Sequence, residues 1–278
     1  MKFWKMHGLG NDYVVIDNRG EKISDREASE LAVKLCKRRF SVGADGVLFV
    51  SNSTVAEVKM RIFNADGSEA EMCGNGIRCF AKYCYENNIA RKSEVVVETL
   101  AGNKRTWLTV ENDAVQSVMV DMGVPELERS KIPMAGQGKF INEDLKVDGD
   151  GYRATCLSVG NPHCVIFVDS VDDFPVERVG SKIENHQLFP KRTNVEFAQV
   201  LGENEVKVRV WERGCGETLA CGTGACATVV AGNLLEKLGC KVLVHLLGGD
   251  LEVEYADSLL MNGAAEKVFE GTLFKENV

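Results

Sequence analysis

The chain has 278 residues, of which 45% are hydrophobic and 27% are charged, a composition typical of a soluble globular protein. The length favours two domains. The net charge of −8 is not offset by any basic cluster, which argues against nucleic acid as a partner, and no apolar run reaches the roughly 20 residues of a membrane-spanning helix. A small-molecule substrate is therefore expected.

The N-terminal segment MKFWKMHGLG lacks the apolar region and cleavage site of a signal peptide, so a cytoplasmic location is expected. The first predicted helix lies in SDREASELAVKLCKRR, where Ser24 and Glu27 have the spacing of a capping box. One face of this helix is apolar and carries Ala28, Leu31, Ala32 and Leu35. We interpret the helix as scaffold.

Each half of the chain combines strand-like segments with one helix that follows a Cys-Gly-x-Gly turn. The strand-like segments are rich in β-branched and aromatic residues. They are GVLFV, VKMRIFN and SEVVVETL in the first half, and CVIFV, NVEFAQV and EVKVRVW in the second. The helices that follow Cys73 and Cys221 are apolar nearly all round, which predicts that a sheet surrounds each of them.

The strongest internal signal is a repeat. At a shift of 148 residues, KMRIFNADGSEAEMCGNG aligns with KVRVWERGCGETLACGTG, with six of 18 positions identical. The identical positions include Arg61/Arg209, Glu69/Glu217 and Cys73/Cys221. At a shift of 150, GNDYVVID aligns with GNPHCVIF, whereas a rival shift of 142 matches little beyond cysteines. We interpret the chain as two copies of one unit.

The boundary between the copies is expected in GVPELERSKIP, where Pro125 and Pro133 interrupt the pattern. This places an N-terminal domain at residues 1–122 and a C-terminal domain at residues 123–263. The remaining segment, residues 264–278, is strand-like and is expected to return to the first domain.

Ten cysteines are many for a reducing compartment, where disulfides seldom persist. No CxxC, HExxH or Walker A string occurs, so no metal site is assigned. Cys79 and Cys215 have no counterpart in the repeat and are treated as structural. Six further cysteines in apolar surroundings are expected to belong to the core: Cys36, Cys84, Cys156, Cys164, Cys226 and Cys240.

Cys73 and Cys221 each stand at the start of a helix. A thiol at this position lies at the positive end of the helix dipole, so we expect its pKa to fall below about 8.5. The glycines that follow leave backbone N–H groups open to a carboxylate. Two opposed thiols, one ionised and one protonated, suit proton exchange on opposite faces of a carbon, which is racemisation or epimerisation. We see no signature of pyridoxal phosphate and expect no cofactor.

Five segments, taken together, resemble the diaminopimelate epimerase family, which interconverts LL- and meso-diaminopimelate without pyridoxal phosphate. They are KMHGLGNDYVVID, FNADGSEAEMCGNGIRCFAKY, GNPHCVIFV, RTNVEF and ERGCGETLACGTGACA. The resemblance covers nearly the whole chain. It implies an α+β fold of two pseudo-symmetric domains, each a mixed, mostly antiparallel, barrel-like β-sheet around a central α-helix. It also implies a homodimer and a role in lysine and peptidoglycan precursor biosynthesis.

The resemblance further implies the roles of individual residues. Cys73 and Cys221 would be the acid and base, with Cys73 the donor and Cys221 the acceptor in the family's convention. His163 and Glu212 would lie near the thiols and tune their pKa values. Glu212 and Arg213 would bind the distal ammonium and carboxylate of the substrate. The full predicted substrate-binding set is Asn11, Asn64, Gly74, Asn75, Asn161, Asn194, Glu212, Arg213, Gly222 and Thr223.

One departure from the family pattern is Gly46, which stands where some members carry a substrate-contacting glutamine, so no binding role is assigned there. Two alternatives to the main interpretation stay open. One is a racemase of the same fold that acts on histidine or proline, although the distal polar set would then be left unpaired. The other is a thiol redox or metal-binding protein, which the ten cysteines favour.

Overall fold

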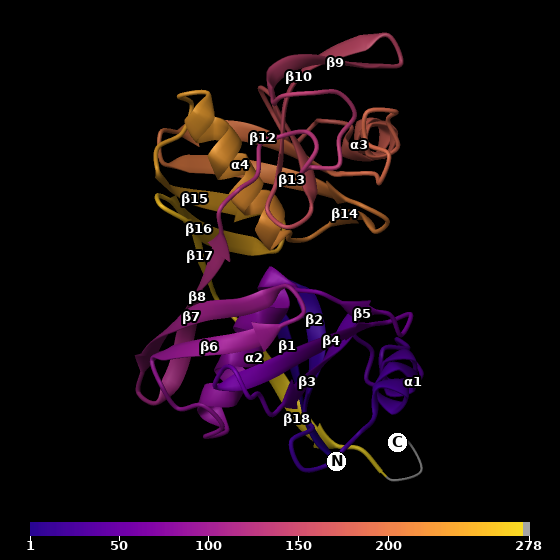
Figure 1. Ribbon diagram of the computed structural model, residues 1–278, viewed down its shortest axis with the longest axis vertical. Coiled ribbons are helices and arrows are strands. Elements are labelled where there is room, and N and C mark those ends of the chain that lie inside the picture. Colours follow the sequence, from indigo (N-terminus) through magenta and orange to yellow (C-terminus); the bar gives the residue numbers. More distant parts are fainter. Residues whose placement is uncertain (275–278) are drawn as a thin grey trace. The chain divides into compact units, whose positions relative to one another are not determined.

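The computed structural model describes residues 1–274 of the chain (Figure 1). The chain divides into two compact units. Unit 1 comprises Met1–Asp121 and the C-terminal segment from Asn262, and unit 2 comprises Met122–Met261. The C-terminal segment contains β18 (Glu266–Thr272), which belongs to unit 1. The strand-like segment expected at residues 264–278 extends to positions 275–278, which lie outside the described residues. No helix within residues 1–274 is long and apolar enough to cross a membrane.

Unit 1 is a mixed, mostly antiparallel sheet with two helices. Its strands pair in the order β18–β1–β2–β3–β4–β6–β7–β8, with parallel pairing at β2/β3 and β4/β6, and the short β5 pairs with β4. The elements are β1 (Lys2–Gly8), β2 (Asn11–Asp17), α1 (Asp25–Leu35), β3 (Gly46–Ser51), β4 (Val58–Asn64), β5 (Glu69–Ala70), α2 (Gly74–Glu86), β6 (Glu94–Thr99), β7 (Gly102–Glu111) and β8 (Ala114–Gly123).

Unit 2 repeats this plan. Its strands pair in the order β9–β10–β11–β12–β13–β15–β16, with parallel pairing at β11/β12 and β13/β15, and the short β14 pairs with β13. The elements are β9 (Phe140–Val147), β10 (Asp150–Ser158), β11 (Pro162–Phe167), α3 (Val176–Glu184), β12 (Asn194–Gly202), β13 (Glu205–Glu212), β14 (Gly216–Thr218), α4 (Gly222–Leu234), β15 (Lys241–Leu246), β16 (Gly249–Tyr255) and β17 (Leu259–Gly263). The predicted pseudo-symmetric α+β fold is confirmed.

The central helices are enclosed by the sheets, as the sequence predicts. α2 contacts β1, β2, β3, β4 and β7, and α4 contacts β10, β11, β12, β13 and β16 (Figure 1). The side chains that the sheets bury include Ile77 and Phe80 on α2 and Val229 and Val230 on α4. The buried surface of α2 also includes one charged side chain, because Arg78 is fully buried there. Its guanidinium donates to the carbonyl oxygens of Gly74 and Ala264.

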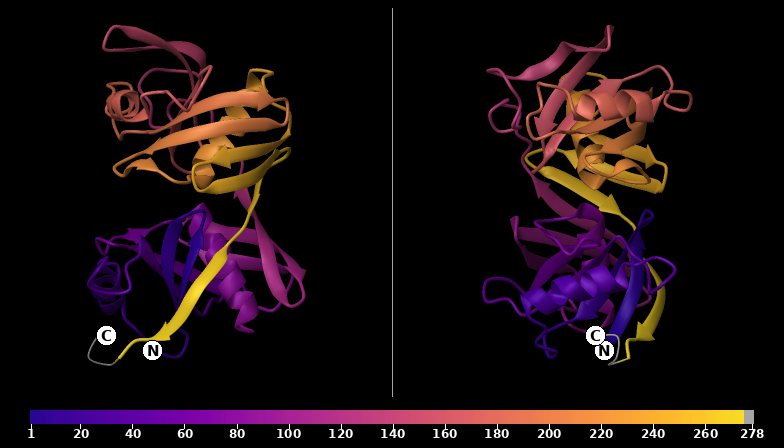
Figure 2. Two further views of the ribbon diagram at one scale, coloured as in Figure 1. Left: turned by 180° about the vertical axis from the view of Figure 1, so that it is seen from behind. Right: turned by 90° about the vertical axis from the view of Figure 1, so that its right-hand side faces the viewer.

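Helix α1 shows how a local signal sets an element boundary. The predicted capping box is present, with the Ser24 N–H donating to Glu27 Oε2 at 2.8 Å and the Glu27 N–H donating to Ser24 Oγ. The helix ends at Leu35, short of the basic residues that follow it in the sequence. Its predicted apolar face is buried against unit 1, and Figure 2 shows α1 in indigo beside the sheet.

The cysteines expected in the core are buried with one exception. Cys36, Cys84, Cys156, Cys164 and Cys226 are buried, but Cys240 is exposed. Cys240 follows the turn after α4 and directly precedes β15, so the sheet does not cover it. Cys79 is buried on α2, whereas Cys215 is exposed in the turn between β13 and β14.

Candidate active site

Cys73 and Cys221 occupy the same position in the two units. Each is the N-cap residue of its central helix and has an extended backbone. The Gly76 N–H donates to Cys73 Sγ at 3.5 Å, and the Gly224 N–H donates to Cys221 Sγ at 3.4 Å. Helix N-caps are usually Ser, Thr, Asp or Asn, which accept such a bond more strongly than sulfur does. The two cysteines are therefore poor caps, which points to a chemical role for the sulfur atoms.

A duplicated ion pair fixes the turn that leads into each helix. Arg61 Nε donates to Glu69 Oε1 at 2.7 Å, and Arg209 Nε donates to Glu217 Oε1 at 2.7 Å. In both pairs the second arginine nitrogen donates to the second carboxylate oxygen. Bidentate pairs of this kind define orientation as well as distance. Each pair joins a short strand to its neighbour just before the cysteine.

In unit 1, Cys73 lies beside two side chains from β2. The Tyr13 hydroxyl is 2.9 Å from Cys73 Sγ and 2.7 Å from Asn11 Oδ1. Asn11 Nδ2 donates in turn to Asp45 Oδ2 at 2.9 Å, and Asp45 is paired with Arg38. Asn75 Nδ2 donates to Asn11 Oδ1 at 3.4 Å. The structure thus brings Cys73, Asn11 and Asn75 together, and adds Tyr13 to them.

Gly46 provides the space that Tyr13 needs. A Cβ atom at Gly46 would lie 2.9 Å from the Phe63 carbonyl oxygen and 3.3 Å from Tyr13 Cε1, because Gly46 and Tyr13 are paired across β3 and β2. Even alanine would therefore crowd the tyrosine ring. The residue that departs from the family pattern is coupled to the side chain beside Cys73.

The other predicted residues of unit 1 lie at the ends of elements. Asn64 ends β4, is exposed, and donates from Nδ2 to Ser68 Oγ at 3.0 Å. Gly74 is the first residue of α2 and is buried. The N–H groups at the start of α2 follow Cys73 directly, which is the arrangement that binds carboxylates at helix N-termini.

In unit 2, His163 is held from both sides. Its Nδ1 lies 2.7 Å from Glu196 Oε1 and its Nε2 lies 2.9 Å from Asn161 Oδ1. Both His163 and Glu196 are fully buried. Glu196 Oε2 has no hydrogen-bond partner among the described residues. A Cβ atom at Gly224 would lie 2.7 Å from Glu196 Oε1, so this close approach depends on the glycine.

Two carboxylates influence Cys221. Burial raises the pKa of Cys221 well above its ordinary value, and Glu212 and Glu196 raise it further. Thr223 Oγ1, 3.4 Å from the sulfur, opposes this only weakly. The expectation that the helix end lowers this pKa is therefore wrong for Cys221, because desolvation of the thiolate and two nearby negative charges outweigh the dipole.

Glu212 is itself perturbed. Burial raises the pKa of its carboxyl, while a 2.5 Å hydrogen bond donated by Thr218 acts in the opposite direction. The charge of Glu196 raises this pKa further, and His163 lowers it. The predicted neighbours of the thiols, His163 and Glu212, thus belong to one electrostatic cluster with Cys221 and Glu196.

Asn194 and Arg213 are joined through the backbone. Asn194 Oδ1 accepts from the Arg213 N–H at 2.9 Å, and Asn194 Nδ2 donates to the Pro162 carbonyl at 2.9 Å. The Arg213 side chain is exposed, with Nη1 3.4 Å from the Lys191 carbonyl oxygen. Gly222 and Thr223 form the first turn of α4 directly after Cys221.

Tyr13 and Glu196 are the residues that sequence reasoning missed. The alignment at a shift of 150 already places Tyr13 on His163, so the repeat contained a signal for Tyr13. Glu196 gave a weaker one, as a single carboxylate within an otherwise apolar part of a predicted strand. Its contact with His163 spans 33 residues of sequence and is visible only in the fold.

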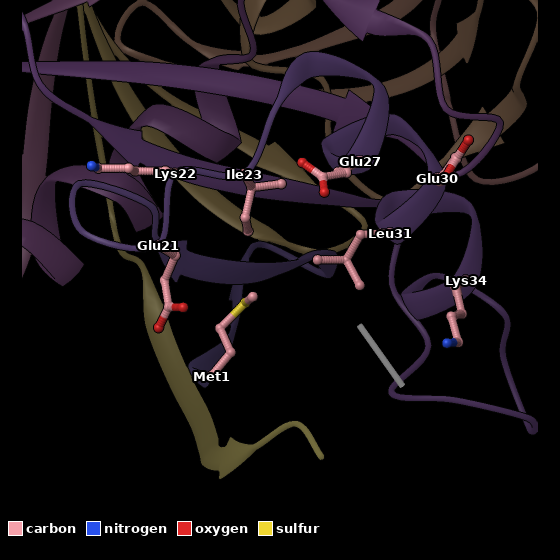
Figure 3. Close-up of a pocket in the computed structure, with 8 residues that line it drawn as sticks. All are labelled: Met1, Glu21, Lys22, Ile23, Glu27, Glu30, Leu31 and Lys34. Carbon is pink, nitrogen blue, oxygen red and sulfur yellow. The ribbon is translucent and has the colours of Figure 1, made fainter. Parts of the chain in front are cut away.

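No group of three or more His, Cys, Asp or Glu side chains that could hold a metal occurs in the described range of 1–274. A pocket lies elsewhere in unit 1, between the start of the chain and α1, with charged side chains such as Lys22 and Glu30 around it (Figure 3). It contains none of the predicted site residues.

Comparison with known proteins identifies the family of this chain. The sequence pattern of the family described as Diaminopimelate epimerase matches residues 3–128 and 155–268. The chain is 54% identical over 274 residues to the diaminopimelate epimerase of Pelotomaculum thermopropionicum, covering 98% of both chains. It is 53% identical over 275 residues to that of Moorella thermoacetica, again covering 98% of both.

The fold also resembles solved structures of low sequence identity. One is a phenazine biosynthesis protein of the PhzF family from Bacillus anthracis, with a TM-score of 0.70, 17% identity and 99% of each chain covered. At this identity the likeness concerns the fold alone. The matched family pattern and the full-length identities above 50% decide the assignment. The chain belongs to the diaminopimelate epimerase family.

Proposed function

We propose that this protein is a diaminopimelate epimerase, which inverts one α-carbon of 2,6-diaminopimelate and so interconverts the LL and meso forms. The observation that carries the proposal is the duplicated helix start, with a cysteine as N-cap in each unit. Relatives that are more than 50% identical over nearly the full length carry this name. The activity would serve lysine and peptidoglycan precursor synthesis.

The proposed reaction uses the two thiols as a matched acid and base. One sulfur, as thiolate, takes the proton from Cα and becomes a thiol. The electron pair left on Cα is delocalised into the adjacent carboxylate. The other sulfur, as thiol, gives its proton to the opposite face of Cα and becomes a thiolate, so protons and charge balance. The reverse reaction exchanges the roles of Cys73 and Cys221.

The proximal carboxylate of the substrate is proposed to bind at the helix starts. Gly74 and Asn75 begin α2, and Gly222 and Thr223 begin α4. Each helix N-terminus stabilises negative charge by up to about 2 kcal/mol in favourable geometry. Charge that grows on the carboxylate as the proton leaves is therefore opposed by backbone N–H groups that are already oriented.

The distal end of the substrate is proposed to bind through polar side chains. Glu212 accepts hydrogen bonds from the distal ammonium, and Arg213 holds the distal carboxylate. Asn11, Asn64 and Asn161 donate to and accept from the same groups. Asn194 is engaged with the backbone at both ends of its amide, which supports a role in positioning Arg213. His163 and Glu212 tune the thiols, together with Glu196.

The charges around Cys221 favour one protonation state before substrate binds. Burial, Glu212 and Glu196 raise the pKa of Cys221, so this sulfur retains its proton in the free protein. Cys221 would then act as the acid in that direction, which is the reverse of the family's convention in which Cys73 is the donor, and the opposite direction exchanges the roles.

The test is hydrogen exchange with solvent. LL-diaminopimelate incubated in heavy water with the purified protein and no added cofactor should take up deuterium at one Cα. Cys73→Ala and Cys221→Ala should each abolish epimerisation, since either change removes one of two required proton carriers. Epimerisation that survives either change would contradict the two-thiol scheme, and faster turnover of histidine or proline would identify another substrate.

We also propose that the protein is a cytoplasmic homodimer. Val268 and Phe269 on β18 are 56% and 46% exposed, and association of two chains would cover such adjacent apolar side chains. A chemistry that depends on reduced thiols suits a reducing compartment. Sedimentation equilibrium should give twice the mass of one chain, and Phe269→Glu should shift the protein to the monomer.

A further inference from the structure

The Tyr13 hydroxyl faces two acceptors but has one proton to donate. Asn11 Oδ1 lies 2.7 Å away and Cys73 Sγ lies 2.9 Å away. A hydroxyl donates along one direction at a time, although its oxygen can also accept. The direction of the O–H bond therefore depends on which of the two acceptors forms the stronger hydrogen bond.

Both the ring and the amide partner are held in place. Tyr13 is 5% exposed, and its ring lies where a side chain at Gly46 would collide with it. Asn11 Nδ2 is bound to Asp45, which fixes the amide with its oxygen toward Tyr13. Burial raises the pKa of Tyr13 well above 10, and the neighbouring Cys73 adds to this effect, so the hydroxyl keeps its proton at neutral pH.

The protonation state of Cys73 decides between the two acceptors. As a thiol, Cys73 can donate to Asn11 Oδ1, which is 3.6 Å from the sulfur, and the Tyr13 hydroxyl donates to the same oxygen. As a thiolate, the sulfur has no proton and only accepts. A charged acceptor forms the stronger hydrogen bond, so the hydroxyl should then turn to the sulfur, where the Gly76 N–H already donates.

We propose that Tyr13 is a positioning residue for Cys73, with a hydroxyl that donates to Asn11 when Cys73 is a thiol and to the sulfur when Cys73 is a thiolate. The inference rests on the proposed function for the role of Cys73 as a proton carrier. When the hydroxyl turns to the sulfur, Asn11 Oδ1 loses that donor. Its oxygen can then accept a hydrogen bond from the substrate in the form of the protein that is ready to remove a proton.

The second unit lacks this arrangement at the equivalent position. His163 aligns with Tyr13, but its ring nitrogens are bound to Asn161 and Glu196. Cys221 Sγ lies 3.4 Å from Thr223 Oγ1 and accepts from the Gly224 N–H, and it is also hydrogen-bonded to the carboxyl group of Glu212. The effect of Tyr13 should therefore be confined to one of the two thiols.

The experiment compares thiol ionisation in the wild type and in Tyr13→Phe, which keeps the ring and removes the hydroxyl. Alkylation by iodoacetamide is followed across pH by mass spectrometry, with Cys73 and Cys221 read from separate peptides. Tyr13→Phe should move the midpoint for Cys73 upward by about one pH unit, since a hydrogen bond to a charged group is lost. The midpoint for Cys221 should not move.

Two further variants make the result specific. Gly46→Ala should move the Cys73 midpoint in the same direction, because the added Cβ displaces the Tyr13 ring while the hydroxyl is retained. Tyr83→Phe, which removes the hydroxyl of another buried tyrosine in unit 1, on α2, should leave both midpoints unchanged. With diaminopimelate, Tyr13→Phe should lower kcat about tenfold or more with a smaller effect on KM.

The inference is overturned if Tyr13→Phe leaves the Cys73 midpoint in place, or if it moves both thiols equally. Alkylation requires no turnover, so this outcome is independent of the proposed function. Failure of the proposed function would appear instead as absence of deuterium uptake by the wild type.

Discussion

At the scale of residues, the same cap position gives the two thiols different surroundings. Cys73 has a phenol and an amide within reach, from Tyr13 and Asn11. Cys221 lies near two carboxylates, Glu212 and Glu196, which disfavour its ionisation. A neutral donor beside one sulfur and negative charge beside the other make the two units chemically unequal, although their backbones repeat.

This inequality gives a pH dependence of stability for Cys221. The pKa of Cys221 is raised in the folded protein, chiefly by burial, whereas in the unfolded chain the thiol ionises near pH 8.5. Above that pH the unfolded state loses a proton that the folded state keeps, so the free energy of unfolding falls as pH rises. One such group contributes a slope of up to about 1.4 kcal/mol per pH unit.

Urea unfolding at pH 8 and at a pH between 9 and 10 measures this effect. Between these two pH values, the free energy of unfolding should fall by about 1 kcal/mol less in Cys221→Ser than in the wild type. Cys240→Ser, which changes an exposed cysteine, should follow the wild type. If the free energy of unfolding of Cys221→Ser falls with pH as steeply as that of the wild type, the Cys221 thiol has the same pKa in the folded and unfolded states.

At the scale of elements, the two central helices start alike but differ in whether a side chain fits at their third residue. Gly76 and Gly224 are both the third residue of their helices. A Cβ atom at Gly76 would have its nearest contacts at 3.4 Å, which is ordinary packing, whereas one at Gly224 would meet Glu196 Oε1 at 2.7 Å. The difference arises because Glu196 lies on β12, and its counterpart at a shift of 148 on β3 is Leu48.

The two glycines therefore form a matched pair of tests. Gly76→Ala should keep or raise stability, by at most about 1 kcal/mol, because alanine favours a helix over glycine. Gly224→Ala should destabilise by about 1–3 kcal/mol, as overpacking does, and should displace Glu196 from His163. The free energy of unfolding from urea titration measures both, and equal effects of the two changes would refute the assigned contact.

At the scale of the whole molecule, the chain returns to where it began. β18 pairs antiparallel with β1 over residues Lys2–His7, so the C-terminal segment completes the first unit (Figure 2). Gly271 on β18 also packs directly against the Phe3 ring, because a Cβ atom at this glycine would lie 2.7 Å from the ring. Unit 1 is thus built from both ends of the sequence, whereas unit 2 is continuous.

Removal of the chain after Ala265 should therefore weaken unit 1 selectively. The lost partner leaves the backbone groups of β1 that face β18 without hydrogen bonds and uncovers Phe3. Amide hydrogen exchange should accelerate in β1 and β2 by at least about tenfold while β12 and β13 keep their protection. Uniform acceleration in both units, or none in β1, would contradict this division.

Much of the fold could be predicted because its signals are local. The strand-like segments became β3, β4, β6, β11, β12 and β13, and the capping box at Ser24 started α1. Alternation of β-branched residues and cap spacing act over a few residues, so the sequence displays them directly. The exposed Cys240 was predicted wrongly and the buried Arg78 was not predicted at all, because solvent exposure depends on which distant segments cover a position.

The same limit applies to the site. The sequence by itself determined the repeat, the paired cysteines at the helix starts and the asparagines that accompany them, since these are patterns along the chain. Only the tertiary structure decided which groups meet each sulfur: Tyr13 reaches Cys73 across 60 residues, and Glu196 joins the cluster around Cys221. The physical reason is that the pKa of a thiol depends on burial and nearby charge, both of which arise when distant segments pack together.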